Sequence, residues 1–204
     1  MADKPRPVCS LARREPARHP NQRMAESWIA DVLRFWFIEL PPHAWFSGDA
    51  STDALVRMRF LTLHEELRRE LPPGALMASE PALAAVIALD QFPRNLYRGQ
   101  PEAFAADGAA LAAAQRAVAL GFDRMFDPTR RHFFYLPFMH AEDRAMQARS
   151  VELCATLGDG EVLGYARRHR EIVDRFGRFP HRNAVLGRPS TPDELEFLKD
   201  GRGF

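Results

Sequence analysis

Apolar residues recur at helical spacing along almost the whole of this 204-residue chain, and prolines or glycines interrupt the pattern. Between Glu26 and Phe37, for example, Trp28, Val32 and Trp36 are four residues apart and share one face of a helix, which predicts that Trp36 is buried. No alternation of strand and helix patterns is visible. The sequence therefore predicts an all-α fold of seven or eight helices, stacked as antiparallel pairs and joined by short loops.

Capping residues and helix breakers set the expected helix boundaries. Pro41 ends the first helix, and Thr191 begins the last one with a capping box that has proline at the first helical position. Residues Phe122–Phe138 are expected to form a loop, in which the aromatic run Phe133–Phe138 is the one candidate strand, weakened by Pro137. The other expected helices are Thr52 up to Pro72, Ser79 up to Pro93, Pro101–Leu120, Met139–Leu157 and Glu161–Phe176.

Charge and composition exclude several classes of protein. With 28 basic and 27 acidic side chains the net charge is only +1, so we expect no nucleic-acid partner. No stretch approaches the roughly 18 consecutive apolar residues of a membrane span, and we expect no membrane association. The two cysteines, Cys9 and Cys154, are predicted to be unpaired thiols in the cytoplasm. Residues 1–24 are expected to be a disordered Arg/Pro-rich tail, followed by a single helical domain over residues 25–204.

A short motif occurs twice and points to a polar site. Asp90-Gln91-Phe92-Pro93-Arg94-Asn95 is echoed by Phe179-Pro180-His181-Arg182-Asn183, each expected just after a helix end. If the prolines stop their helices, both arginines lie on loops, and two facing guanidinium groups would make a clamp for a carboxylate or phosphate. The alternative is structural: Arg94 and Arg182 would pair with Asp90, Asp143 or backbone carbonyls.

A second polar group follows Pro137. His140, Glu142 and Asp143 are expected in the first turn of a helix, where His140 and Asp143 would share a face. His181 is the best candidate for a general acid or base because its reference pKa is near neutrality. A metal site is not expected, because the usual histidine spacings of metal-binding helices are absent. Capping of a helix start is the simpler interpretation of these acidic residues.

Four motifs together resemble a known family. They are Phe35-Trp36-Phe37, Leu89–Asn95, Phe133–His140 with Glu142, and Gly177–Asn183 continuing through Gly187-Arg188 to Ser190-Thr191. In this order they are similar to the bacterial domain-of-unknown-function family 924, over roughly Ala25–Leu198. The resemblance implies an all-helical superhelix similar to tetratricopeptide-repeat folds. The family has no agreed activity, so the resemblance assigns no role to any residue.

The residues of the polar motifs leave two functions open. The first is binding of an anionic small molecule or peptide, and the alternative is a small hydrolase-like enzyme that uses His181 with His140, Glu142 and Asp143, with or without a metal. No Gly-rich phosphate loop, dinucleotide fingerprint or nucleophile elbow is present, so no cofactor is identified. The oligomeric state is also left open. The candidate ligand-binding residues are Asp90, Arg94, Asn95, Tyr135, His140, Glu142, Asp143, His181, Arg182, Asn183 and Arg188.

Overall fold

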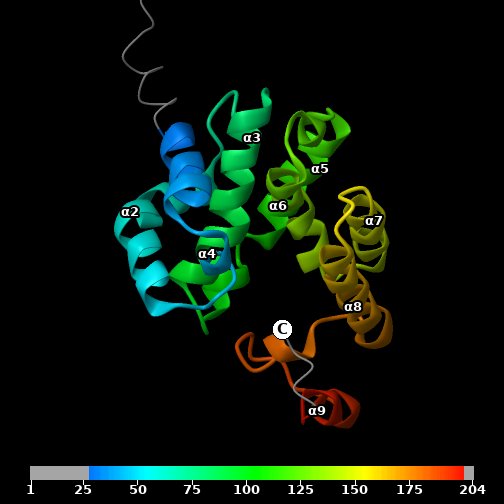
Figure 1. The fold of residues 1–204 in the computed structure, drawn as a ribbon. Coiled ribbons are helices and arrows are strands. Elements are labelled where there is room, and N and C mark those ends of the chain that lie inside the picture. The colour runs from blue at the N-terminus through cyan, green and yellow to red at the C-terminus, as the bar shows by residue number, and fades with distance from the viewer. Residues whose placement is uncertain (1–27, 200–204) are drawn as a thin grey trace, which may run out of the picture.

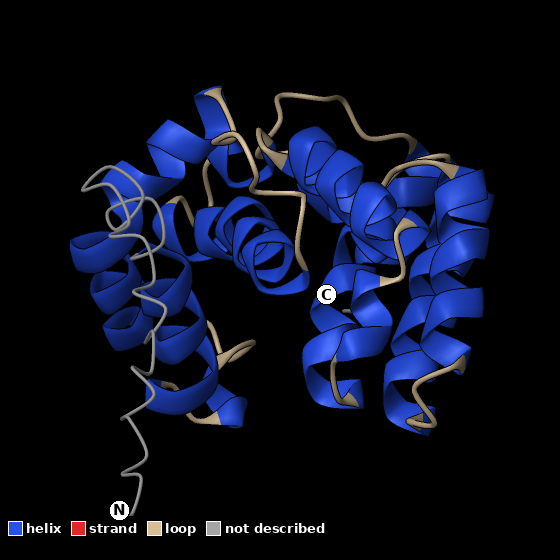
Figure 2. Ribbon diagram, turned by 90° about the horizontal axis from the view of Figure 1, so that it is seen from above, coloured by secondary structure: helices blue, strands red, loops and turns tan. Residues whose placement is uncertain are grey.

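The structure is a computed structural model that describes residues 28–199, and within this range it contains helices and connections but no strand (Figure 2). This confirms the predicted all-α fold. The tetratricopeptide-like arrangement stays a prediction, and the expected tail over residues 1–24 lies outside the described residues. No helix within the described range is both long and apolar enough to cross a bilayer.

The chain begins with a helix over residues 28–34, which continues into the π-helical turn η1 (Phe35–Glu39). The remaining α-helices are α2 (Ala50–Arg69), α3 (Ser79–Val86), α4 (Phe92–Leu96), α5 (Asp107–Ala119), α6 (Pro128–His140), α7 (Arg144–Ala155), α8 (Gly160–Phe176) and α9 (Pro192–Lys199). Short helical turns connect them: η2 (Pro42–Ala44), η3 (Ile87–Gln91), η4 (Pro101–Phe104), η5 (Phe122–Met125) and η6 (Pro180–Arg182).

The helices are arranged around α3 and α6 (Figure 1). The first helix and α2 lie on one side, and α5, α7 and α8 lie on the other. Along the chain α5 packs against α6, α6 against α7, and α7 against α8, while α2 packs against α4. The η6 turn and α9 lie below this stack in Figure 1. The C-terminal segment therefore returns toward the ends of helices that come earlier in the chain.

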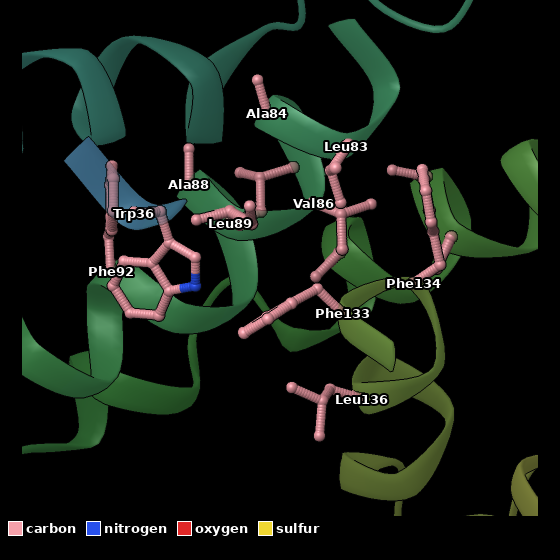
Figure 3. Close-up of a cluster of buried hydrophobic side chains, with 14 of the residues drawn as sticks. Trp36, Leu83, Ala84, Val86, Ala88, Leu89, Phe92, Phe133, Phe134 and Leu136 are labelled. Carbon is pink, nitrogen blue, oxygen red and sulfur yellow. The ribbon is translucent and has the colours of Figure 1, made fainter. Parts of the chain in front are cut away.

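Aromatic side chains form the centre of the core (Figure 3). Trp36 is fully buried, as its place on the apolar face of the first helix predicts. Its ring centroid lies 5.8 Å from that of Phe92 and 5.9 Å from that of Phe133, both in edge-to-face geometry. Phe133 comes from α6, so this contact joins the N-terminal helix to the middle of the chain.

The predicted loop over Phe122–Phe138 is wrong, and so is its candidate strand, because residues 128–140 form α6. The Asp127 carboxylate accepts a hydrogen bond of 3.1 Å from the Arg130 N–H, and Pro128 occupies the first helical turn. Pro137 lies only three residues from the end of the helix, where its missing N–H removes one bond from the last turn. Burial of every side chain from Phe133 to Met139 outweighs that loss.

The predicted helix end before Pro93 is also wrong, because α3, the π-helical turn η3 and α4 follow one another without a break. In the wider turn the Phe92 N–H donates to the Ile87 carbonyl, and Pro93 has no N–H for the following carbonyl, that of Ala88. The buried His64 ring supplies that donor, with Nδ1 2.9 Å from the Ala88 oxygen. Since a carbonyl oxygen only accepts, Nδ1 carries the proton.

We expect His64→Leu to lower the free energy of unfolding by about 1 to 3 kcal/mol, because the Ala88 carbonyl would lose its donor in a buried place. His64→Gln keeps an N–H group on a side chain of similar length and should recover most of this loss. Urea denaturation of both variants measures the difference. Equal stability of the two variants would mean that this hydrogen bond does not support the helix at Pro93.

Candidate functional site

A cavity of about 290 Å³ lies where α4, η4, α6, α8 and η6 meet, and three arginines and three histidines contribute to its wall. It is open to solvent on one side. The residues that line it are Arg94, Arg98, Gly99, Ala103, Phe104, His140, His169, His181 and Arg182. So many basic and imidazole groups around one cavity, without a lining carboxylate, favour a negatively charged occupant.

The end of α8 sets the direction of the chain that brings His181 and Arg182 to this cavity. Gly177 ends the helix in the left-handed conformation, with φ of +72°, and its N–H donates 2.8 Å to the Val173 carbonyl. The next residues turn back, and the Phe179 N–H donates 2.7 Å to Oε1 of Glu142. The short turn η6 is thereby fixed against the connection between α6 and α7.

Asp107, the first residue of α5, holds two guanidinium groups at the cavity wall. Its Oδ1 accepts a hydrogen bond of 3.0 Å from Nη2 of Arg94, and its Oδ2 accepts one of 3.1 Å from Nη1 of Arg182. Arg94 and Arg182 come from the two Phe-Pro motifs, so the structure does bring the two motifs to one site. Two cations share a single carboxylate there.

Asp90 lies behind this wall and is almost fully buried. Its carboxylate is 2.9 Å from Nδ1 of His140 and 3.4 Å from Nη1 of Arg94, and Nε2 of Gln91 donates to it at 2.5 Å. Burial by itself would raise the pKa of Asp90, but the charge of Arg94 and the hydrogen bonds from His140 and Gln91 outweigh it and hold that pKa below its usual value. Asp90 is therefore ionised and fixes both cavity residues in place.

The three histidines of the cavity are neutral at pH 7. Burial lowers the pKa of His169 to about 3, with His140, Arg182 and His181 adding to the effect. Burial and the neighbouring Arg182 lower the pKa of His181 to about 4. The pKa of His140 is also lowered, by burial first and then by Arg94. A neutral imidazole ring has one donor and one acceptor nitrogen. Nδ1 of His140 donates to Asp90 and Nδ1 of His169 donates to the Tyr165 carbonyl, so Nε2 of each of these two rings is an acceptor.

Arg182 is the least well compensated charge at the site. Its side chain is 8% exposed, and its guanidinium carbon lies 4.5 Å from the ring centroid of Phe104 and 4.7 Å from that of Phe179. Burial and the charge of Arg94 lower its pKa, although Asp107 acts in the opposite direction. Within residues 28–199 its buried Nε has no hydrogen-bond partner. An added negative charge would therefore stabilise this side chain.

Other predicted site residues form a separate network beside the cavity. Nη1 and Nη2 of Arg188 donate to Glu142 at 2.6 and 2.9 Å, and its Nε donates 3.0 Å to Oδ1 of Asn183. The Asn183 amide donates to Ser190 and Glu194, at 3.0 and 3.2 Å. These contacts tie the segment after η6 to the α6–α7 connection and to α9. Glu142, Asn183 and Arg188 therefore hold the cavity's frame and do not line it.

The remaining predicted residues lie away from the cavity. The Asn95 amide donates 2.8 Å to Asp53, and the Tyr135 hydroxyl donates 2.7 Å to Asp123. Asp143 caps α7 by accepting 2.9 Å from the Met146 N–H. These three side chains are engaged in contacts within the fold.

Two local expectations are corrected here. His140, Glu142 and Asp143 do not begin one helix, because His140 ends α6 and Asp143 precedes α7, so His140 and Asp143 share no helix face. Arg94 lies within α4 and not on a loop, because the π-helical turn carries the helix past Pro93. The structural alternative is also corrected in part: Arg182 pairs with Asp107, not with Asp90 or Asp143.

Sequence reasoning missed several important residues. The pattern places His169 on a helix face like any core residue, and a lone histidine on the apolar stripe of α8 is the signal that could have identified it. Asp107 was expected inside a helix that starts at Pro101, and nothing local marks it as the partner of Arg94 and Arg182. Nothing in the sequence marks Phe104 or Arg98 as residues that line the cavity. Their roles depend on contacts between segments far apart in the chain.

The geometry bears on the metal-assisted alternative as well. Across the described part of the chain, no three or more His, Cys, Asp or Glu side chains are placed to hold a metal ion together. Glu142 is paired with Arg188 and Asp143 caps α7, so neither joins His181 in the cavity.

Comparisons with other proteins agree with the motifs in the sequence. Residues 32–202 match the family described as bacterial proteins of unknown function, DUF924. A solved structure of a protein of unknown function from Agrobacterium tumefaciens is 41% identical, with a TM-score of 0.82, over 86% of this chain and 99% of that one. No curated protein is significantly similar to the chain in sequence. The chain belongs to the DUF924 family of bacterial proteins of unknown function.

Proposed function

We propose that this protein binds a small anionic molecule, a carboxylate or phosphate compound, in the cavity formed by the two Phe-Pro motifs. The observation that carries the proposal is the sharing of one carboxylate, Asp107, by two guanidinium groups at the cavity wall. Arg94 has Asp90 as a second anionic partner, whereas Arg182 has no second ion pair at salt-bridge distance within the described chain. A bound anion would give Arg182 a second anionic partner.

The size of the cavity narrows the ligand to a small molecule. About 290 Å³ is at the lower end of the roughly 300 to 1,000 Å³ typical of small-molecule sites, and it leaves no room for a folded partner. Arg182 lines the cavity, and its planar guanidinium suits two oxygens of one carboxylate or phosphate. The Nδ1 protons of His140 and His169 are used within the fold, so the donors for an anion come from the guanidinium groups. Binding is favoured over hydrolysis because the two acidic residues expected to assist His181 are engaged elsewhere.

We expect inorganic phosphate, sulfate or acetate to raise the melting temperature of the protein relative to chloride at matched ionic strength, since a ligand of the native state stabilises it by mass action. Arg182→Met should weaken binding of the best of these anions at least tenfold, because it removes a buried charge-assisted donor. Titration calorimetry measures both affinities. Arg116→Met, on the exposed surface of α5, is the matched control and should bind like the wild type.

Two outcomes would contradict the proposal. One is a wild-type protein that binds none of the three anions at millimolar concentration. The other is equal loss of binding in Arg182→Met and Arg116→Met, which would show that the anions respond to surface charge and not to the cavity.

A further inference from the structure

A second, smaller hollow of about 180 Å³ lies on the other side of Arg94 and Arg98. Those two arginines line both hollows, so the hollows are neighbours that share a wall. The second is lined by Trp45, Phe46, Gly48, Gln91, Arg94, Asn95 and Arg98. The first hollow thus offers charge and imidazole groups, and the second adds two aromatic rings to the same two arginines.

Of the two aromatic rings in this second hollow, the fold holds Trp45 in place and leaves much of Phe46 exposed. Trp45 is held by a hydrogen bond of 2.7 Å from its Nε1 to the Trp36 carbonyl, and its ring centroid is 5.2 Å from that of Phe133 in edge-to-face geometry. Phe46 stands beside it with its ring centroid 6.5 Å away, and 61% of Phe46 is exposed. An exposed phenylalanine beside a fixed tryptophan provides an apolar surface that a flat ring can cover.

The position of Arg98 between the hollows is also fixed. Asp53 binds its guanidinium in a bidentate manner, at 2.7 and 2.8 Å, and Asn95 donates 2.8 Å to the same carboxylate. Gly48 has a φ of +68°, and a Cβ there would lie 3.6 Å from Nη1 of Arg98. That distance is ordinary van der Waals contact, so it is the positive φ that calls for glycine here. The loop passes beside the guanidinium, whose flat face suits stacking on a ring.

We infer that the ligand of this site is a small aromatic anion, whose negative group is held at Arg94 and Arg182 and whose ring lies toward Arg98, Trp45 and Phe46. This inference rests on the proposed function and names the class of compound. It follows from the shared arginines, because a charged group bound at Arg94 brings any attached ring to the edge of the aromatic hollow. An anion without a ring leaves Phe46 exposed.

The test compares pairs of anions that differ only in the ring: benzoate with acetate, and phenyl phosphate with methyl phosphate. We expect each aromatic compound to bind the wild-type protein at least tenfold more tightly than its methyl counterpart. Phe46→Ala should reduce this advantage to threefold or less and leave the affinity for methyl phosphate unchanged, since Phe46 does not touch the charged group. Calorimetry gives all four constants, and Phe46 is exposed enough for its replacement to leave the fold intact.

Met125→Ala is the matched control, because Met125 is a similarly exposed apolar residue, 72% accessible, that lines neither hollow. It should keep the full advantage of the aromatic compounds. If the wild type binds methyl phosphate and phenyl phosphate equally well, the inference is overturned and the proposed anion site stands. If neither phosphate and neither carboxylate binds, both fail. A full aromatic advantage in Phe46→Ala would also overturn the placement of the ring.

Discussion

Arg94→Met is expected to lower the free energy of unfolding by about 3 to 5 kcal/mol, the usual cost of removing one partner of a buried ion pair. Arg94 contacts both Asp90 and Asp107 and also donates a hydrogen bond to the Asp90 carbonyl. Asp90 is 1% exposed, so without Arg94 its buried carboxylate would lose its guanidinium partner and keep the hydrogen bonds with Gln91 and His140. Urea denaturation of the ligand-free protein at pH 7 measures the loss.

Arg182→Met is the matched variant, and its stability should lie within about 1 kcal/mol of the wild type. Asp107 keeps Arg94 as its partner in this variant, and methionine preserves much of the contact with Phe104 and Phe179. The opposite directions of the two pKa shifts agree with this contrast, since the site raises the pKa of Arg94 and lowers that of Arg182. Equal losses of about 3 kcal/mol or more would identify both arginines as structural ion pairs and contradict an anion clamp.

These two arginines show what a motif can and cannot predict. Phe-Pro followed by Arg-Asn occurs twice, and the arginines of both copies, Arg94 and Arg182, line one cavity. Their roles differ because each depends on a carboxylate from elsewhere: Asp90 lies one turn before Arg94, whereas Asp107 is 75 residues from Arg182. A pairing across that distance depends on the fold bringing the first residue of α5 beside η6, which no local pattern records.

The helices themselves were predictable where their signals are local. The capping box at Thr191 does begin α9, with the Glu194 carboxylate accepting 2.7 Å from the Thr191 N–H. Two of the wrong boundaries concern proline, at Pro93 and Pro137. The general rule that proline stops a helix was overridden by distant groups, namely the His64 ring at one place and the burial of the aromatic face of α6 at the other.

The composition of the cavity could be predicted only in part. The motifs pointed to His140, His181, Arg94 and Arg182, all of which line the cavity. They did not point to His169, because its place on an apolar face of α8 suits an ordinary core residue equally well. The ring centroids of His140 and His169 are 6.3 Å apart because α7 and α8 fold back against α6. That proximity is a property of the helix stack, and it is also the origin of the pH dependence that we expect.

We expect the free energy of unfolding to fall between pH 7 and pH 5, and His169 alone should account for about 2 kcal/mol of the loss. The sign follows from the pKa of His169, lowered from 6.5 to about 3 in the native state. Below pH 6.5 His169 binds a proton in the unfolded chain but stays neutral in the native state. The contribution of His169 to the free energy of unfolding is therefore complete above pH 6.5 and is lost as the pH falls. Carboxylates contribute little to the loss between pH 7 and pH 5, because their pKa values in the unfolded chain are about 4.

Urea denaturation at the two pH values measures this loss, and His169→Gln should reduce it by about 2 kcal/mol, because glutamine has no proton to gain. Sulfate gives the decisive comparison, since it does not titrate between pH 5 and pH 7. An anion beside Arg182 would offset the cationic surroundings of His169 and His181, raise their pKa values and so shrink the loss of stability. By linkage, sulfate should then bind more tightly at pH 5 than at pH 7. The same loss in sulfate and in chloride at matched ionic strength would place the bound anion away from these histidines, outside the cavity.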